Sequence, residues 1–90
     1  MVRQCVVIRN TLGVHARAAA KFVHAAGGFA SRVTVSHGER SADGKSILGI
    51  LLLAAARGSE ITVAAEGHDE TEALAALVAL IDSGFGEGSS

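Results

Sequence analysis

The stretch EITVAAEGHDETEALAALVALIDSG, residues 60–84, contains both of the periodic patterns from which this domain is built. Its first part, residues 60–66, is rich in β-branched side chains and predicts a strand. From Asp69 onward the apolar residues are spaced as on one face of a helix, and Asp69 followed by Glu72 predicts a capping box. Gly84 is expected to end this helix. The apolar positions are Leu74, Leu77, Val78 and Ile81.

Three more strands are predicted before this pair of elements. Residues 2–9 are rich in β-branched residues, and residues 32–37 alternate between apolar and polar side chains. Gly38 favours a hairpin that leads into a short strand near residues 39–42.

Two helical segments lie between these strands. Residues 16–26 carry an apolar helical face, and Gly27 with Gly28 is expected to end it. Ser46 stands directly before an apolar run, which makes it a good N-cap, and Gly58 is expected to close that segment. The order strand, helix, strand, strand, helix, strand, helix is most simply satisfied by one sheet with all three helices on one face. This is a two-layer α+β sandwich.

The composition fits a single small domain. Ninety residues with 49% apolar side chains suffice for one core, and we expect one domain over residues 1–85 and a flexible tail over 86–90. A formal net charge of −1 and 3% aromatic residues argue against nucleic-acid binding. The single cysteine, Cys5, excludes a disulfide framework and is expected to pack within its strand. The four histidines show no metal-ligand spacing, so neither a metal nor a cofactor is expected.

Neither a signal peptide nor a membrane-inserted segment is expected. Residues 2–9 interleave charges with a short apolar run, unlike a secretory leader. The longest apolar run, residues 47–56, has about half the roughly 20 residues that a spanning helix needs, and it predicts a buried helix instead. We therefore expect a soluble, cytoplasmic protein.

His15 is the first candidate for chemistry. It lies just before a predicted helix, where backbone N–H groups lack intrahelical partners and the helix dipole is positive. This environment favours the neutral imidazole, which keeps a lone pair for attack, and it also favours a bound anion. Arg17 can contact phosphate oxygens, and Gly13 lets the backbone come close. The pattern fits a phosphoryl-accepting histidine, but an ordinary polar residue at a helix start has the same spacing.

Ser46 is the second candidate, and it has two interpretations. Helix capping alone explains a serine here, since it contributes ~1 kcal/mol. A phosphate on Ser46, beside Lys45, would instead be held by the helix N-terminus and would place negative charge next to an apolar surface. The sequence GKS at residues 44–46 is not a Walker loop, because the first glycine of that motif would fall at Glu39.

The apolar run after Ser46 also has two interpretations. A two-layer domain buries only one face of each helix, so some of Leu48, Leu51 and Leu52 are expected to be exposed. Exposed apolar patches mark surfaces that dock partners. The alternative is that the whole segment lies at the centre of the core.

Two motifs together resemble those of a known family. GVHARAAA at residues 13–20 and GKSILG at residues 44–49 closely resemble motifs of HPr, the histidine-containing phosphocarrier of the bacterial phosphoenolpyruvate-dependent phosphotransferase system. The resemblance covers essentially the whole chain, including its length and its element order. It implies an open-faced sandwich with a four-stranded antiparallel sheet. It also implies a phosphoryl carrier that acts with partner enzymes rather than an enzyme in its own right.

The resemblance assigns roles to individual residues. His15 matches the phosphorylated histidine, which carries its phosphoryl group on Nδ1, Arg17 matches the arginine of the motif, and Ser46 matches the regulatory serine. The implied donor is phospho-enzyme I, itself charged by phosphoenolpyruvate, and the acceptor is an enzyme IIA-type domain. Where a host has an HPr kinase/phosphorylase, Ser46 would be its target. The carrier is expected to be a monomer. Its expected docking residues are Ala20, Ile47, Leu48, Leu51 and Leu52.

Some positions depart from the usual family pattern. Ala18 stands where the motif usually has proline, and leucine and isoleucine follow Ser46 where methionine or phenylalanine are common. Ala18 and the ending GFGE at residues 84–87 are similar to proteobacterial branches tied to the nitrogen-type phosphotransferase system, which regulate more than they import sugar. Two functions stay open: a phosphocarrier that acts through His15, and a regulatory binding module that acts mainly through phosphorylation of Ser46.

Overall fold

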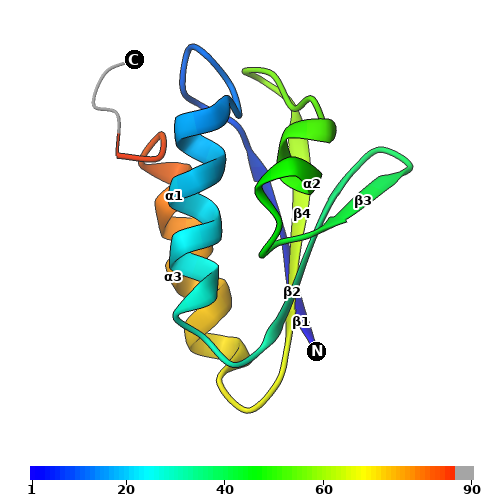
Figure 1. The fold of residues 1–90 in the computed structure, drawn as a ribbon, viewed down its shortest axis with the longest axis vertical. Coiled ribbons are helices and arrows are strands. Elements are labelled where there is room, and N and C mark those ends of the chain that lie inside the picture. The colour runs from blue at the N-terminus through cyan, green and yellow to red at the C-terminus, as the bar shows by residue number, and fades with distance from the viewer. Residues whose placement is uncertain (87–90) are drawn as a thin grey trace.

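One antiparallel sheet of four strands, covered on one face by three helices, makes up the part of the chain that the computed structural model describes, residues 1–86 (Figure 1). The strands are β1 (Val2–Val7), β2 (Arg32–His37), β3 (Arg40–Asp43) and β4 (Glu60–Glu66). The helices are α1 (Ala16–Gly27), α2 (Ile47–Leu52) and α3 (Glu70–Asp82). The strand order is β1-β4-β2-β3, with every neighbouring pair antiparallel. The predicted open-faced sandwich is confirmed.

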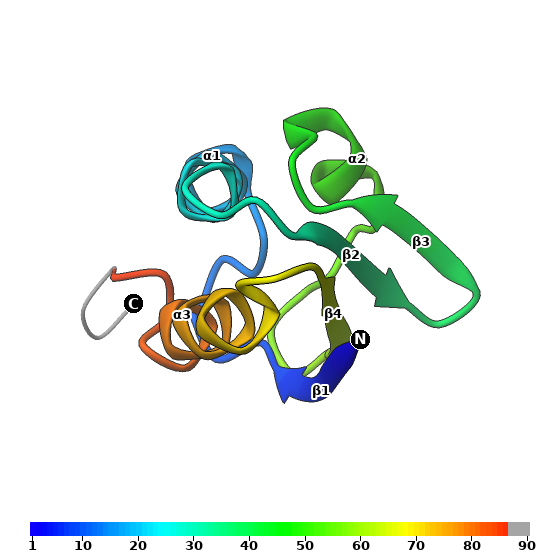
Figure 2. The same cartoon turned by 90° about the horizontal axis from the view of Figure 1, so that it is seen from below.

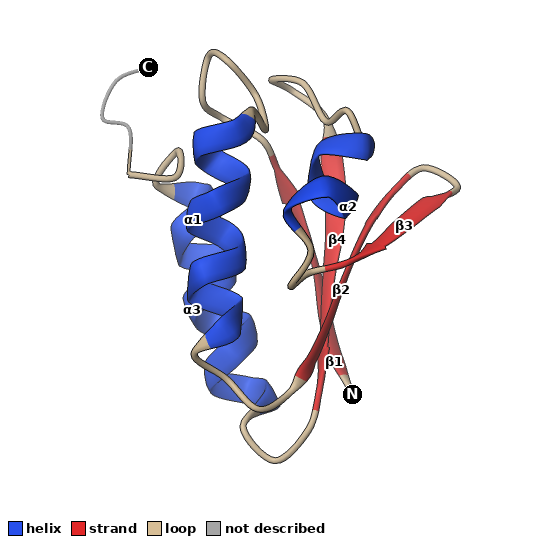
Figure 3. Cartoon of the chain, in the orientation of Figure 1, coloured by secondary structure: helices blue, strands red, loops and turns tan. Residues whose placement is uncertain are grey.

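The helices gather on one side of the sheet, as the end-on view in Figure 2 shows. Helix α3 packs against β1 and β4, α1 packs beside it, and α2 contacts α1 and β3 (Figure 3). The opposite face of the sheet has no helix over it among residues 1–86. Cys5 lies exposed on this open face, with its Sγ 3.4 Å from Oγ1 of Thr62. The prediction that Cys5 is a packing residue rather than a nucleophile is therefore wrong as to packing, because the inward position of β1 is its neighbour Val6.

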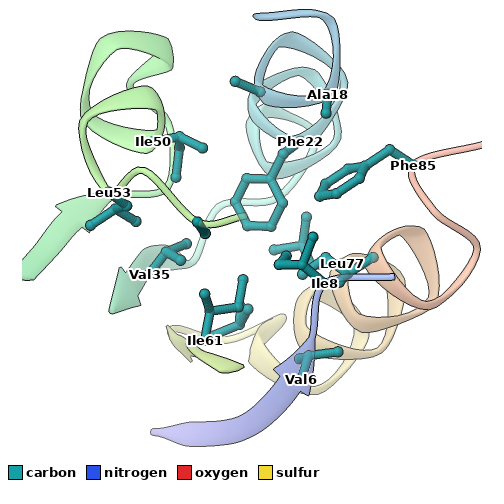
Figure 4. Close-up of a cluster of buried hydrophobic side chains, with 14 of the residues drawn as sticks. Val6, Ile8, Ala18, Phe22, Val35, Ile50, Leu53, Ile61, Leu77 and Phe85 are labelled. Atoms are coloured by element: carbon teal, nitrogen blue, oxygen red, sulfur yellow. The ribbon is translucent and has the colours of Figure 1, made fainter. Parts of the chain in front are cut away.

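The core lies between the sheet and the helices (Figure 4). Alternate residues of β2 and β4 point inward and are buried. From α3, Leu77 and Ile81 are fully buried while Leu74 and Val78 pack partly against the core, which confirms the predicted apolar stripe. From α1, alanines line much of the buried face and let this helix approach closely. Its buried residues are Ala18, Ala19, Phe22 and Ala26.

The second helix is shorter than predicted. Helix α2 ends at Leu52 and not near Gly58, because Ala54 adopts a left-handed backbone with φ +52° that a right-handed helix cannot contain. The apolar run 47–56 is thus one short helix and part of a loop. No helix within residues 1–86 is long and apolar enough to cross a membrane. Strand β3 begins at Arg40, one residue later than predicted.

Asp69 does not cap α3 with its side chain, so the predicted capping box is wrong. Its carboxylate instead accepts hydrogen bonds from Ala30 N–H at 2.8 Å, from Ser31 N–H at 2.9 Å and from the Ser31 hydroxyl. These bonds tie the loop between α1 and β2 to the start of α3. The Ser31 hydroxyl first, then the N–H of Ala30, lower the pKa of Asp69 from 3.8 to about 2.

The stability of the fold should therefore depend on pH through Asp69. A carboxyl whose pKa is lowered in the folded chain stabilises it above pH about 4, and that contribution is lost as the pH falls to about 2. We expect the urea midpoint of the wild type to fall across this window. Asp69→Asn should have a lower midpoint at neutral pH and a flatter profile from pH 4 to 2. Glu72→Gln, at an exposed carboxylate of the same helical turn, should keep the wild-type profile.

Candidate functional site

His15 occupies the N-cap of α1, where backbone and ring are both held. Its extended backbone (φ −96°, ψ −178°) lets its carbonyl accept the N–H of Ala19 at 2.8 Å, and its Nδ1 accepts the N–H of Arg17 at 3.2 Å. A ring nitrogen that accepts a hydrogen bond carries a lone pair and no proton, so the hydrogen of the neutral ring is on Nε2. The structure thus presents Nδ1 of a half-buried imidazole at the positive end of a helix.

The loop before His15 is fixed by two sets of hydrogen bonds. The buried Asn10 closes it, since its Nδ2 donates to the carbonyl of Gly13 at 2.6 Å and its own carbonyl accepts the Gly13 N–H at 3.1 Å. Val14 N–H then donates to the carbonyl of Ala55 at 2.9 Å, which docks the loop on the segment after α2. Sequence reasoning singled out Gly13 in this loop but missed Asn10 and Ala55. Neither residue carries a local pattern that distinguishes it from an ordinary turn residue.

Arg17 lies exposed in the first turn of α1, two residues after His15. Within residues 1–86 its guanidinium takes part in no ion pair. The first turn of α1 has no acidic residue, and residues 1–38 contain no aspartate or glutamate at all. A phosphoryl group at the N-terminus of α1 would therefore have cationic and N–H groups from residues 1–38 beside it. That part of the chain contributes no carboxylate to repel it.

Ser46 caps α2, as predicted. Its Oγ accepts the N–H of Gly49 at 3.0 Å, and its carbonyl accepts that of Ile50 at 3.0 Å. The neighbouring Lys45 does not turn toward the Ser46 hydroxyl, because its Nζ donates to the carbonyl of Phe29 at 2.9 Å. The hydroxyl is half-buried and lies directly before the exposed side chains of α2.

Helix α2 buries one face and exposes the other. Ile50 and the following Leu53 are buried in the core, whereas Leu48 and Leu52 are 66% and 62% exposed and Leu51 is half-buried. The expectation that some of these leucines are exposed is confirmed for Leu48 and Leu52. The exposed side chains of Ile47, Leu48 and Leu52 are named the apolar patch below.

The apolar patch and His15 lie at the same end of the molecule. In Figure 1 the start of α1 and the whole of α2 are at one end, and the two helices contact each other. Ala20, also predicted for docking, is exposed one turn further along α1. Leu12, in the loop before His15, is 70% exposed and was missed, because a leucine in a turn carries no periodic pattern.

The β2–β3 hairpin holds the end of α2. Nδ1 of His37 lies 2.8 Å from the carbonyl of Leu53, and Nη1 of Arg40 donates to the carbonyl of Leu52 at 3.0 Å. Positive or N–H-bearing side chains at a helix C-terminus satisfy its last carbonyls. His37 is therefore engaged in supporting α2. No group of three or more histidine, cysteine or acidic residues within residues 1–86 is arranged to hold a metal ion.

A half-buried imidazole at a helix start, beside an arginine and an apolar patch on an open-faced sandwich, defines a class: small proteins that carry a phosphoryl group between partners. Comparison with known proteins agrees. Residues 2–83 match the family model described as the PTS HPr component phosphorylation site. The chain belongs to this HPr family of the phosphotransferase system.

Individual relatives cover nearly the whole chain. The phosphocarrier protein HPr of Cupriavidus necator is 49% identical over 88 residues, which are 98% of this chain and 99% of that protein. The phosphocarrier protein NPr of Shewanella violacea is 43% identical over 84 residues, covering 93% and 92%. Among solved structures, HPr-C-His from Thermoanaerobacter tengcongensis superposes with a TM-score of 0.93 at 44% identity, covering 97% and 98%. The fold and the family are thus shared along the full domain.

Proposed function

We propose that this chain carries a phosphoryl group on Nδ1 of His15, accepts it from phospho-enzyme I and passes it to an enzyme IIA-type domain. The observation that supports this most directly is the N–H of Arg17, which donates to Nδ1 at 3.2 Å. This hydrogen bond places Nδ1, the nucleophilic atom, at the N-terminus of α1, where the helix dipole and the free N–H groups favour anions. The cellular setting that fits is the cytoplasm, with the carrier acting as a monomer.

The transfer is a displacement at phosphorus. The N–H of Arg17 passes from Nδ1 to a phosphoryl oxygen, and the freed Nδ1 lone pair of His15 forms a bond to phosphorus, while the bond from phosphorus to the donor atom breaks and its electron pair leaves with the donor. The guanidinium of Arg17 and the first-turn N–H groups of α1 balance the charge on the phosphoryl oxygens. In transfer to the acceptor protein, a nucleophile of that protein forms the new bond to phosphorus. The bond between Nδ1 and phosphorus breaks, and its electron pair returns to Nδ1. An open site with one arginine holds the group less firmly than a deep pocket would, which suits a carrier that must release it.

The direct test uses the whole chain. Incubation with phosphoenolpyruvate and enzyme I should add the mass of one phosphoryl group, and the adduct should be labile in acid and stable in base. Peptide mapping should place it on the peptide that contains His15. No mass gain, or an acid-stable adduct, would contradict the proposal.

The apolar patch, with Ala20 and Leu51 beside it, is proposed to dock these partner enzymes. Leu48→Ser replaces an exposed apolar side chain by a polar one, so stability should change by less than about 0.5 kcal/mol. The KM of enzyme I for the carrier should rise roughly five- to tenfold with kcat unchanged, because only docking is weakened. Steady-state kinetics measures both. Val7→Ser, an exposed position of β1, should leave KM unchanged; an equal rise there would contradict docking by the patch.

A second candidate function is regulation through Ser46. Its half-buried hydroxyl caps α2 beside Ile47 and Leu48, so a phosphate there would place about two negative charges at the edge of the apolar patch. We propose that an HPr kinase/phosphorylase modifies Ser46 and that the modification weakens exchange with enzyme I. ATP-dependent labelling should disappear in Ser46→Ala and persist in Ser41→Ala, at an exposed serine of β3. Labelling that survives Ser46→Ala would argue against this function.

We further propose that this chain is the carrier of a nitrogen-type phosphotransferase system rather than of a system that imports sugar. Support comes from Ala18 and the ending at residues 84–87, and from the NPr of Shewanella violacea among the relatives. The phosphorylated chain should transfer its group faster to a nitrogen-type enzyme IIA than to a sugar-type one. Equal or opposite rates would contradict this assignment.

A further inference from the structure

The chain turns back after α3 and inserts Phe85 into the core. The ring of Phe85 is 1% exposed and belongs to the same buried cluster as Ala18, Phe22 and Leu77 (Figure 4). Its backbone has φ +60°, a left-handed conformation that is unfavourable for a bulky side chain. Such a conformation persists only where the surroundings hold it. The burial of the ring therefore outweighs local backbone strain.

A second contact joins Phe85 to α1. Nζ of Lys21 donates to the carbonyl of Phe85 at 2.9 Å. Lys21 follows Ala18 by three residues, so both lie on the same side of α1. The ring of Phe85 thus packs in the cluster that contains Ala18, and its carbonyl binds Lys21. Both residues belong to the first two turns of α1. These are the turns whose N-terminal end presents the Arg17 N–H to His15.

The first turn of α1 has few stabilising features of its own. It lacks an acidic residue that would favour the helix dipole. Ala18 occupies a first-turn position at which a proline would preset φ without loss of a helical hydrogen bond. A short helix gains most of its stability from tertiary packing, and Ala18 is fully buried. The geometry of this turn consequently depends on what packs beneath it.

We propose that Phe85 is a positioning residue for phosphoryl transfer, which holds the first turn of α1 so that the Arg17 N–H stays beside Nδ1 of His15, placed to donate to the oxygens of the incoming phosphoryl group. This inference rests on the proposed carrier function. Loosening the turn should slow the transfer step more than it weakens docking, because the side chains of the apolar patch point away from the core that Phe85 fills.

Phe85→Leu tests this in the full chain. We expect kcat for phosphorylation by enzyme I to fall roughly five- to tenfold, with KM within about twofold of the wild type. Hydrogen exchange of the Arg17 amide should quicken by a similar factor, about five- to tenfold. The matched control is Val33→Ala, a core truncation near the start of β2, which lies at the opposite end of the molecule from the start of α1 (Figure 1). It should lower the thermal midpoint without changing kcat or the Arg17 exchange rate.

Three results would overturn the proposal. These are an unchanged kcat in Phe85→Leu, a raised KM in place of a lowered kcat, or an equal kcat loss in Val33→Ala at matched thermal stability. Should Phe85→Leu not fold, Lys21→Gln should show the same effects at about twofold, with Lys21→Arg, which keeps the charge, as its control.

The test also separates this inference from the proposed function. The exchange rate of the Arg17 amide is measured on the unphosphorylated chain and reports on the helix end alone. A wild-type chain that takes up no phosphoryl group would contradict the carrier function through His15. Unchanged Arg17 exchange in a normally phosphorylated Phe85→Leu would contradict only the role of Phe85.

Discussion

His15→Ala is expected to accept no phosphoryl group from phospho-enzyme I, a loss of transfer rate of at least about a thousandfold. The substitution removes the only atom that the proposed displacement uses as nucleophile, and nothing else in the first turn of α1 replaces it. His24→Ala provides the matched control, because His24 is an exposed histidine of the same helix. It should be phosphorylated at the wild-type rate.

The same substitution also removes a helix cap, and the two effects need separating. His15→Ala should cost about 0.5–2 kcal/mol of stability, since Nδ1 no longer accepts the N–H of Arg17. His15→Asn restores an acceptor at the N-cap and should recover most of this stability in thermal unfolding while transfer stays abolished. An acid-labile adduct on His15→Asn, or its loss in His24→Ala, would show that another residue accepts the group.

Local rules account for much of what the sequence predicted. The stripe of Leu74, Leu77, Val78 and Ile81 marks α3 because helical periodicity is a property of one segment. His15 and Ser46 were placed at helix starts for the same reason, since an N-cap depends on the few residues that follow it. Both are N-caps in the structure.

Contacts between distant segments account for the errors and omissions. The Asp69 carboxylate could cap its own helix by its spacing, but it binds the loop at Ala30 and Ser31, 39 and 38 residues away in sequence. Ala54 ends α2 through a backbone conformation that alanine rarely adopts. Neither the partners of the Asp69 carboxylate nor the backbone conformation of Ala54 can be read from a local sequence pattern.

The site shows the same division between local and distant effects. The loop of His15 is held by Ala55, and the helix beneath it contacts Phe85, which comes from the opposite end of the chain. The orientation of the imidazole is therefore a tertiary property, although its position at a helix start is a local one. Substitutions in these supporting segments are informative because they change the geometry of the site without touching its reacting atoms.

Gly13→Ala should have the second-largest effect, on stability and transfer together. Gly13 has φ +67°, and a Cβ there would lie 2.8 Å from the carbonyl oxygen of Ala55 and 2.9 Å from Cα of Ala56. Both atoms belong to backbone, which cannot rotate away as a side chain does. The loop must shift, and the Val14 N–H bond to Ala55 stretches or breaks. We expect a loss of about 3 kcal/mol in urea unfolding, from strain and collision together.

Gly38→Ala separates the collision from the strain. Gly38 has nearly the same backbone, φ +62°, but a Cβ there would meet nothing within 4 Å. It should lose only about 1 kcal/mol, the cost of a left-handed alanine, and keep the wild-type transfer rate. Gly13→Ala should also transfer roughly tenfold more slowly, because the displaced loop carries His15 away from the Arg17 N–H. Equal stability losses in the two variants would show that the loop relieves the collision at no cost beyond the strain of a left-handed alanine. The Ala55–Ala56 backbone would then not be what fixes the orientation of the imidazole.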